Sequence, residues 1–155
     1  MDVRVHVDDR DAERELKVIA AGLHDLRSFW PMLVPVVSSW WRRMYATEGA
    51  FAGSPWAPLS ASYAAWKAAH YPGKGILQAS GKMRQAVSRP HRSQTPTTLT
   101  LSIESPVLGY HQEGGGSLPK RELVFSDPLP ALAALELDAV AERYVTDLLG
   151  RARAR

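Results

Sequence analysis

The chain has 155 residues, of which 45% are hydrophobic and 23% are charged, and its formal net charge is +3. This composition is typical of a globular domain, and the length is enough to bury a core without metal or disulfide crosslinks. Because the sequence has no cysteine, disulfides, thiolate catalysis and cysteine-ligated metal sites are excluded. We expect a single domain over residues 1–155.

The beginning of the sequence does not have the pattern of an export signal. Acidic residues crowd positions 8–15, and no long apolar core follows the first residue. No apolar run approaches the roughly 20 residues that a membrane-spanning helix needs. We therefore expect a protein that is made in the cytoplasm, is not exported and has no membrane partner.

The first part of the chain predicts an extended arm followed by helices. Valines alternate with polar residues in 1–9, which predicts a strand or a flexible arm. Leu16, Ile19, Leu23 and Leu26 recur at helical spacing and predict an amphipathic helix over 10–27. Pro31 and Pro35 interrupt the next apolar segment, which predicts a kinked or restarted helix over 32–46.

Two short helices are expected in the middle of the chain. Ser60 can cap a helix that runs to His70, with Tyr63 and Trp66 facing inward. Ser80 can cap a second short helix, with Met83 and Val87 on one face. The glycines and prolines of 49–58 and 71–75 predict loops around the first of these helices.

The last third predicts a small sheet and a closing helix. Residues 89–96 are polar and contain proline, which predicts a loop, whereas alternation at Leu99, Leu101 and Ile103 predicts a half-buried strand. A further strand is expected over 122–125. Leu137, Val140, Tyr144 and Leu148 form the stripe of a final helix that is expected to end at Gly150, before a flexible basic tail over 151–155.

This order predicts an α+β fold, with N-terminal helices and a C-terminal helix packed on a small antiparallel sheet. The apolar block that includes Trp40 and Trp41 belongs either to the core or to a contact between subunits, and the sequence leaves both alternatives open.

The sequence offers little that predicts catalysis. Its five histidines are scattered and form no metal-binding pair, and there is no GxSxG motif, so we expect no cofactor, no metal and no catalytic residue. His111 is either a general base or, as we favour, a buried hydrogen-bonding residue. Trp56, between two prolines, either stacks on a ligand or, as we favour, anchors the core.

Four short phrases stand out because of their order and spacing. They are Trp56-Ala57-Pro58-Leu59-Ser60, then Ile76-Leu77-Gln78-Ala79-Ser80-Gly81, then Tyr110-His111-Gln112-Glu113-Gly114, and last Pro119-Lys120-Arg121. Gly115 and Gly116 extend the third phrase into a glycine run, which allows backbone conformations closed to other residues.

With these phrases the chain resembles the phage virion morphogenesis proteins, also called tail-completion proteins, of long-tailed bacteriophages. The resemblance covers about half of the chain. Met83 stands at the usual place of a leucine, Tyr110 lies closer to His111 than is usual, and Glu122 stands where the family has proline.

The resemblance implies a structural virion protein at the head–tail junction. Such proteins complete or cap the tail tube and help to join it to the head, as homo-oligomeric rings that are commonly sixfold. Their partners are tail-tube and connector or neck proteins, with passing contact to genomic DNA. On this reading Trp40, Trp41, Gly115 and Gly116 are candidate assembly contacts.

Two other classes of function remain open at this stage. A DNA-binding accessory protein would use Arg89, Arg92 and the arginine-rich tail to contact phosphates. A small hydrolase would use His111.

Overall fold

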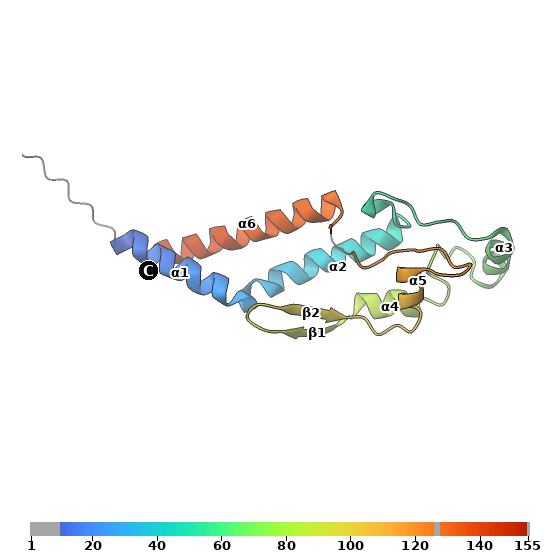
Figure 1. Ribbon diagram of the computed structural model, residues 1–155, viewed down its shortest axis with the longest axis horizontal. Helices are drawn as coiled ribbons and strands as arrows, with labels where there is room; N and C mark the ends of the chain where they lie inside the picture. Colours follow the sequence, from blue (N-terminus) through green and yellow to red (C-terminus); the bar gives the residue numbers. More distant parts are fainter. Residues whose placement is uncertain (1–9, 126–127, 155) are drawn as a thin grey trace, which may run out of the picture.

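Three helices run along the length of the molecule and form its frame (Figure 1). They are α1 (Arg10–His24), α2 (Trp30–Ala46) and α6 (Ala131–Arg153). Helix α6 packs against both α1 and α2, and it runs antiparallel to them. The structure is a computed structural model that describes residues 10–125 and 128–154. The predicted arm at 1–9 therefore lies outside the described residues.

The shorter elements lie on the side of α2 that faces away from α6 and beyond the C-terminal end of α2 (Figure 1). They are α3 (Ala61–His70), α4 (Lys82–Ser88), α5 (Leu108–Glu113) and the hairpin of β1 (His91–Gln94) and β2 (Leu99–Ser102). Helix α2 contacts α6 on one side and α4 on the other (Figure 1). The α+β class is confirmed. The sheet has two antiparallel strands, and the core lies mainly among helices and loops.

The break between the first two helices falls before Pro31. Helix α1 ends at His24, and a single 3₁₀ turn, η1 (Leu26–Ser28), follows. Asp25 caps this turn, because its carboxylate accepts from the Arg27 N–H at 3.1 Å. Pro31 lies in the first turn of α2, where its missing N–H costs nothing, and α2 continues through Pro35. The prediction of a restarted helix is confirmed, with its start two residues earlier than expected.

The hairpin corrects the prediction of a loop over 89–96. Residues 91–94 pair with 99–102 in antiparallel register, from His91 opposite Ser102 to Gln94 opposite Leu99. All four residues of β1 are exposed, so the strand has no apolar alternation to reveal it. The turn is tied to the η1 region, because Pro96 O accepts from Leu26 N at 2.7 Å and Thr95 O accepts from Trp30 Nε1 at 2.9 Å.

Two predictions for the C-terminal part of the chain are wrong, namely a strand over 122–125 and the end of the last helix at Gly150. Residues 122–125 form no strand, because the Gln112 side chain binds the N–H groups of Leu123 and Val124. Helix α6 does not end at Gly150 but continues to Arg153, and Ala152 is fully buried. Residues 151–153 therefore belong to a helix that packs against α1, where Arg153 lies 3.4 Å from Glu15.

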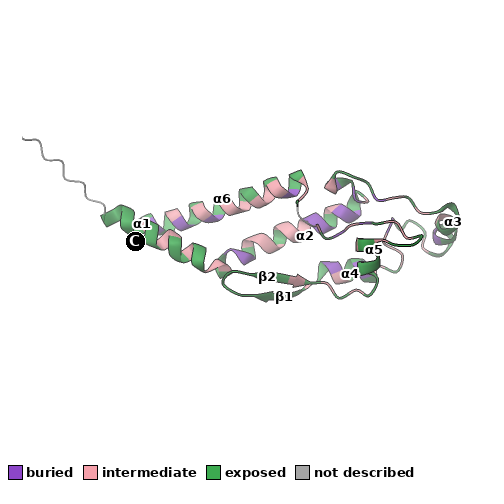
Figure 2. Ribbon diagram, in the orientation of Figure 1, coloured by how far each residue is buried: buried purple, intermediate pink, exposed green. Residues whose placement is uncertain are grey.

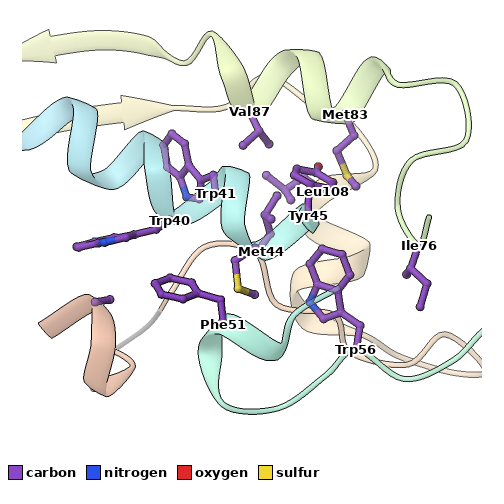
Figure 3. Close-up of a cluster of buried hydrophobic side chains, with 12 residues drawn as sticks. Trp40, Trp41, Met44, Tyr45, Phe51, Trp56, Ile76, Met83, Val87 and Leu108 are labelled. Atoms are coloured by element: carbon purple, nitrogen blue, oxygen red, sulfur yellow. The ribbon is translucent and has the colours of Figure 1, made fainter. Parts of the chain in front are cut away.

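Buried side chains concentrate on α2 and on the loops beside it, whereas α1 is mostly exposed (Figure 2). The main cluster holds Trp40, Trp41, Met44 and Tyr45 of α2 together with Phe51, Trp56, Met83 and Val87 (Figure 3). Met83 and Val87 lie on the buried face of α4, as predicted. Trp40 donates from Nε1 to Glu136 of α6 at 2.7 Å, which fixes α2 against α6.

Tyr45 carries a buried hydroxyl that has no hydrogen-bond partner among the described residues. Burial raises the pKa of Tyr45 to about 12. Because the folded state holds this proton more tightly than the unfolded chain, ionisation above pH 10 favours unfolding.

Tyr45→Phe is therefore expected to preserve or raise the free energy of unfolding at pH 7, by up to about 1 kcal/mol. It is also expected to reduce the loss of stability between pH 10 and pH 12, where the folded and unfolded pKa values of Tyr45 lie. Urea unfolding of both proteins across this range measures the two effects. Destabilisation by more than about 1 kcal/mol at pH 7 would show that the hydroxyl has a partner.

Candidate functional site

A groove of about 1120 Å³ opens between the starts of α3 and α4 and the segments on either side of α5. It brings together residues from all four of the phrases that stand out in the sequence. Those that line it are Pro58, Leu59, Ser60, Leu77, Ala79, Ser80, Gly81, His111, Pro119 and Arg121. Residues as far as 63 positions apart in the chain, Pro58 and Arg121, thus meet on one surface, which we call the phrase groove.

Arg121 joins the last phrase to the first. Its side chain is buried, with 4% of the residue exposed. Nε donates to Ala57 O at 3.0 Å and Nη2 donates to Pro58 O at 3.1 Å. These bonds satisfy two carbonyls of an irregular segment that has no secondary structure to do so. Burial lowers the pKa of Arg121 from its ordinary value.

Lys67 is the second buried cation of the phrase groove. It lies on α3 with 3% of the residue exposed, and Nζ donates to Gly75 O. Burial lowers the pKa of Lys67, and the nearby Arg121 lowers it further, although Glu48 opposes both effects. Among the described residues neither Lys67 nor Arg121 forms an ion pair with a carboxylate. Two cations therefore lie at the groove, and both donate hydrogen bonds to backbone carbonyl groups.

His111 lines the groove beside Arg121 but is not arranged as a general base. Its backbone carbonyl accepts from Arg121 N at 2.7 Å. Nδ1 is buried, and in the part of the chain that the structure describes no hydroxyl or carboxylate is hydrogen-bonded to the ring. Burial, with a smaller effect of Arg121, lowers the pKa of His111 and keeps the ring neutral. The residue as a whole is half-buried, and its buried Nδ1 lacks the hydrogen bond that we predicted.

Gln112 and Gly114 hold in place the segments of chain next to Pro119 and Arg121, which line the groove. Gln112 Oε1 accepts from the N–H groups of Leu123 and Val124, both at 3.0 Å, and Nε2 donates to Val124 O. Gly114 ends α5 at a φ of 72°, and a Cβ there would lie 2.8 Å from Lys120 N. Only glycine fits this approach, so the third phrase holds the fourth in place.

Trp56 and Ile76 are core residues beneath the groove. Trp56 is 7% exposed, packs edge-on against Tyr45 with ring centroids 5.9 Å apart, and donates from Nε1 to Glu122 O at 2.9 Å. Ile76 is also buried, and its N–H donates to Glu48 Oε1 at 2.8 Å. Because Trp56 is buried, its role as a core anchor is favoured over a role in stacking on a ligand.

The prediction that Tyr63 and Trp66 face inward is wrong. They are 44% and 45% exposed, and they form an aromatic ladder on the outer face of α3. Trp66 stacks on Tyr63 at 5.5 Å and on His70 at 4.6 Å between ring centroids. Lys67 is the residue that faces inward instead, because its ammonium reaches Gly75 O while its aliphatic part is buried.

The predicted assembly contacts differ in exposure: the two tryptophans are buried and the two glycines are exposed. Trp40 and Trp41 are each 5% exposed and lie in the core, so they are not available for contacts between folded subunits. Gly115 and Gly116 are exposed in a turn that is closed by two hydrogen bonds between Gly115 and Leu118, each of 2.9 Å. Tyr110 is 69% exposed and does not line the groove.

The basic residues of the DNA-binding hypothesis lie on separate elements. Arg89 follows α4, Arg92 lies on exposed β1, and Arg151 and Arg153 lie on α6 beside α1 (Figure 1). Arg89 shares a smaller groove of about 420 Å³ with Arg42 and Arg84, and no carboxylate lines it. The sequence did not predict this arginine cluster, because its members come from α2, α4 and the loop that follows.

The sequence also missed Lys67, Lys82, Glu104 and Val107, which line the phrase groove. Only Lys67 left a signal, as the one charged residue in an otherwise apolar and small-residue stretch over 61–69. No described helix is long and apolar enough to cross a bilayer, and residues 10–125 and 128–154 contain no cluster of three candidate metal ligands. Comparison with known family models, curated proteins and solved structures finds no match to this chain.

Proposed function

We propose that this chain is a structural, non-enzymatic subunit of the head–tail junction of a long-tailed bacteriophage. It completes or caps the tail tube and helps to join the tail to the head, by forming a ring of identical copies. Its further partners are tail-tube and connector or neck proteins, and its place is in the assembled virion. The proposal rests on the resemblance to tail-completion proteins.

One structural observation carries the proposal furthest. The four phrases of the resemblance meet around one groove, and Arg121 of the last phrase is hydrogen-bonded to Ala57 and Pro58 of the first. Their polar side chains bind backbone groups and build the surface, as in the amide clamp of Gln112. Surface loops that a rigid scaffold holds in place are where binding residues are concentrated.

The exposed aromatic ladder supports association with another protein. Tyr63 lines the phrase groove, and Trp66 and His70 continue from it along α3. Tryptophan and tyrosine are enriched among the residues that dominate binding at protein interfaces. Rings that are already stacked also lose little side-chain freedom when a partner covers them.

Trp66→Ala is expected to weaken ring formation without unfolding the subunit. Loss of an interface anchor costs about 2 kcal/mol or more, which raises the concentration needed for assembly about 30-fold. The free energy of unfolding should change by no more than about 1 kcal/mol, because Trp66 is half-exposed. Light scattering with negative-stain microscopy measures assembly, and urea unfolding measures stability.

Leu23→Ala is the matched control, since Leu23 is 50% exposed on α1 at the other end of the molecule. Assembly is expected to survive this change. A wild-type protein that stays monomeric at high concentration and never associates with tails would overturn the proposed function.

A DNA-binding accessory role is the second candidate, favoured by the cluster of Arg42, Arg84 and Arg89. Phosphate contacts by three arginines would make duplex binding by the isolated subunit fall steeply with salt. Salt-dependent binding by a protein that forms no ring would favour this second role.

A further inference from the structure

The first turns of α6 carry an apolar and acidic face that nothing in the described chain covers. Leu132 and Leu135 are 55% and 64% exposed. Asp138, Ala139 and Glu142 follow them at helical spacing and are also exposed. The opposite side of the helix, with Ala133 and Tyr144, is buried. We call the exposed residues Leu132, Leu135, Asp138, Ala139 and Glu142 the α6 face.

The phrase groove has the complementary chemistry. Its walls include Leu59, Leu77, Met83 and Val107, which can receive leucine side chains. Its charged lining residues are Lys67, Lys82 and Arg121 against a single carboxylate, Glu104, and His111 is kept neutral by burial. The groove thus carries a surplus of two positive charges, and the α6 face carries the two negative charges of Asp138 and Glu142.

Two buried cations make this complementarity more than a matter of net charge. Lys67 and Arg121 are almost fully buried and donate to neutral carbonyl groups, although the nearby Glu48 raises the pKa of Lys67. A desolvated cation is stabilised when an acidic surface covers the opening above it. Arg143, the nearest cation on α6, lines a groove beside Pro35 together with Ala139 of the α6 face, so one positive charge borders this face.

The two surfaces cannot meet within one molecule. Helix α2 lies between α6 and α4, and the start of α4 lines the phrase groove, so α2 separates the groove from α6 (Figure 1). If they bind each other, they do so between copies, and a pair of copies in contact keeps one free groove and one free face. Such a heterologous contact repeats from copy to copy and produces a ring when the rotation closes.

We propose that the α6 face of one copy docks into the phrase groove of the next. This inference deepens the proposed ring function and rests on it for the closure of the ring. An amphipathic helix that lays apolar anchors into a groove is a common mode of recognition. The leucines supply the buried area, and the charge pairs set the orientation.

The absence of cysteine from the sequence allows a direct test by disulfide crosslinking. Leu135→Cys places a thiol on the α6 face, and Val107→Cys places one at the groove, where Val107 is 47% exposed. The two variants are mixed under mild oxidation, and the products are identified by non-reducing electrophoresis and mass spectrometry. We expect the main product to be a dimer in which a disulfide joins the two introduced thiols, one from each variant.

The matched control pairs Leu135→Cys with Leu16→Cys, since Leu16 is 65% exposed on α1 and belongs to neither surface. The groove pair should react about tenfold faster than the control pair, as expected for thiols held together by binding. Equal rates would overturn the docking proposal. Absence of the groove–face disulfide at concentrations where the mixture associates would do the same.

Charge reversal provides a second, independent readout. Asp138→Lys with Glu142→Lys should raise the assembly concentration about tenfold, and Lys82→Glu in the same chain should restore part of that loss. Lys82 is exposed, so its substitution leaves the fold intact. No effect of the reversal, or no recovery with Lys82→Glu, would contradict the pairing.

The experiments distinguish an error in the proposed contact from an error in the proposed function. Rings that form without the disulfide between the α6 face and the phrase groove would leave the proposed function standing and remove this contact. Crosslinked chains that never associate with phage tails would establish the contact and remove the proposed function.

Discussion

Replacement of Trp56 by alanine is expected to lower the free energy of unfolding by about 3–5 kcal/mol, as is typical for a buried tryptophan. The indole is 7% exposed, packs edge-on against Tyr45 and closely approaches Gly49, where a Cβ would lie 2.5 Å from the ring. The substitution also leaves Glu122 O without the Nε1 donor that lies 2.9 Å away. Against a total of about 5–15 kcal/mol, this loss endangers folding.

Trp66→Ala is the matched comparison, ten positions further along the chain. It removes the same side chain from a site that is 45% exposed, so the expected loss is below about 1 kcal/mol. Trp56→Phe retains most of the ring and should cost less than Trp56→Ala. Denaturant unfolding of the three variants measures these differences, and equal losses at the two tryptophans would contradict the roles assigned to them.

These two tryptophans also show what the sequence could predict and what it could not. Trp56 is expected in the core because it lies between two prolines in a loop that must be anchored. Trp66 is expected in the core because it is aromatic and shares a helix with Tyr63. The structure instead buries Lys67, whose ammonium reaches Gly75 O, and no local periodicity reveals that a carbonyl eight residues away accepts from it.

Helices were predictable wherever an apolar stripe defines them. The stripe at Leu137, Val140, Tyr144 and Leu148 indicates the correct buried side of α6, and the spacing at Met83 and Val87 indicates that of α4. Strand β1 was missed because all four of its residues are exposed. Its pairing depends on β2 and on a turn held by Leu26 and Trp30, which are distant in the chain.

The candidate site was predictable as a set of residues but not as a surface. The four phrases contain half of the residues that line the phrase groove, yet nothing in their spacing indicates that Arg121 bonds to Ala57 and Pro58. The α6 face was missed for a different reason. Its leucines lie beside the buried stripe of the same helix, and a periodic pattern does not say how much of an apolar face a neighbour covers.

Gln112→Ala is expected to produce the second large loss, about 2–3 kcal/mol of unfolding free energy. The side-chain amide binds three backbone groups of an irregular segment, the N–H groups of Leu123 and Val124 and the carbonyl of Val124. Leu123 is fully buried, so water cannot replace the acceptor that its N–H would lose. Val124 is 37% exposed, and its groups can be hydrated, which keeps the expected loss at this level.

Two variants make this test specific. Gln112→Met keeps most of the length and packing of the side chain but has no amide, so its loss should be close to that of Gln112→Ala if the hydrogen bonds hold the segment. Gln85→Ala, on an exposed position of α4, should change stability by less than about 0.5 kcal/mol. Urea unfolding at pH 7 ranks the three variants, and a Gln112→Met protein as stable as the wild type would show that packing, rather than the hydrogen bonds of the amide, holds the segment.

The same substitution links the fold to the proposed contact between copies. Arg121 lies just before the segment that Gln112 binds, so loss of the amide clamp frees the stretch of chain that carries a buried cation into the phrase groove. Gln112→Ala introduced beside Val107→Cys should therefore slow crosslinking to Leu135→Cys under conditions where the subunit is still folded. Unchanged crosslinking in the folded variant would mean that the groove keeps its shape without the clamp, and that Gln112 contributes to stability alone.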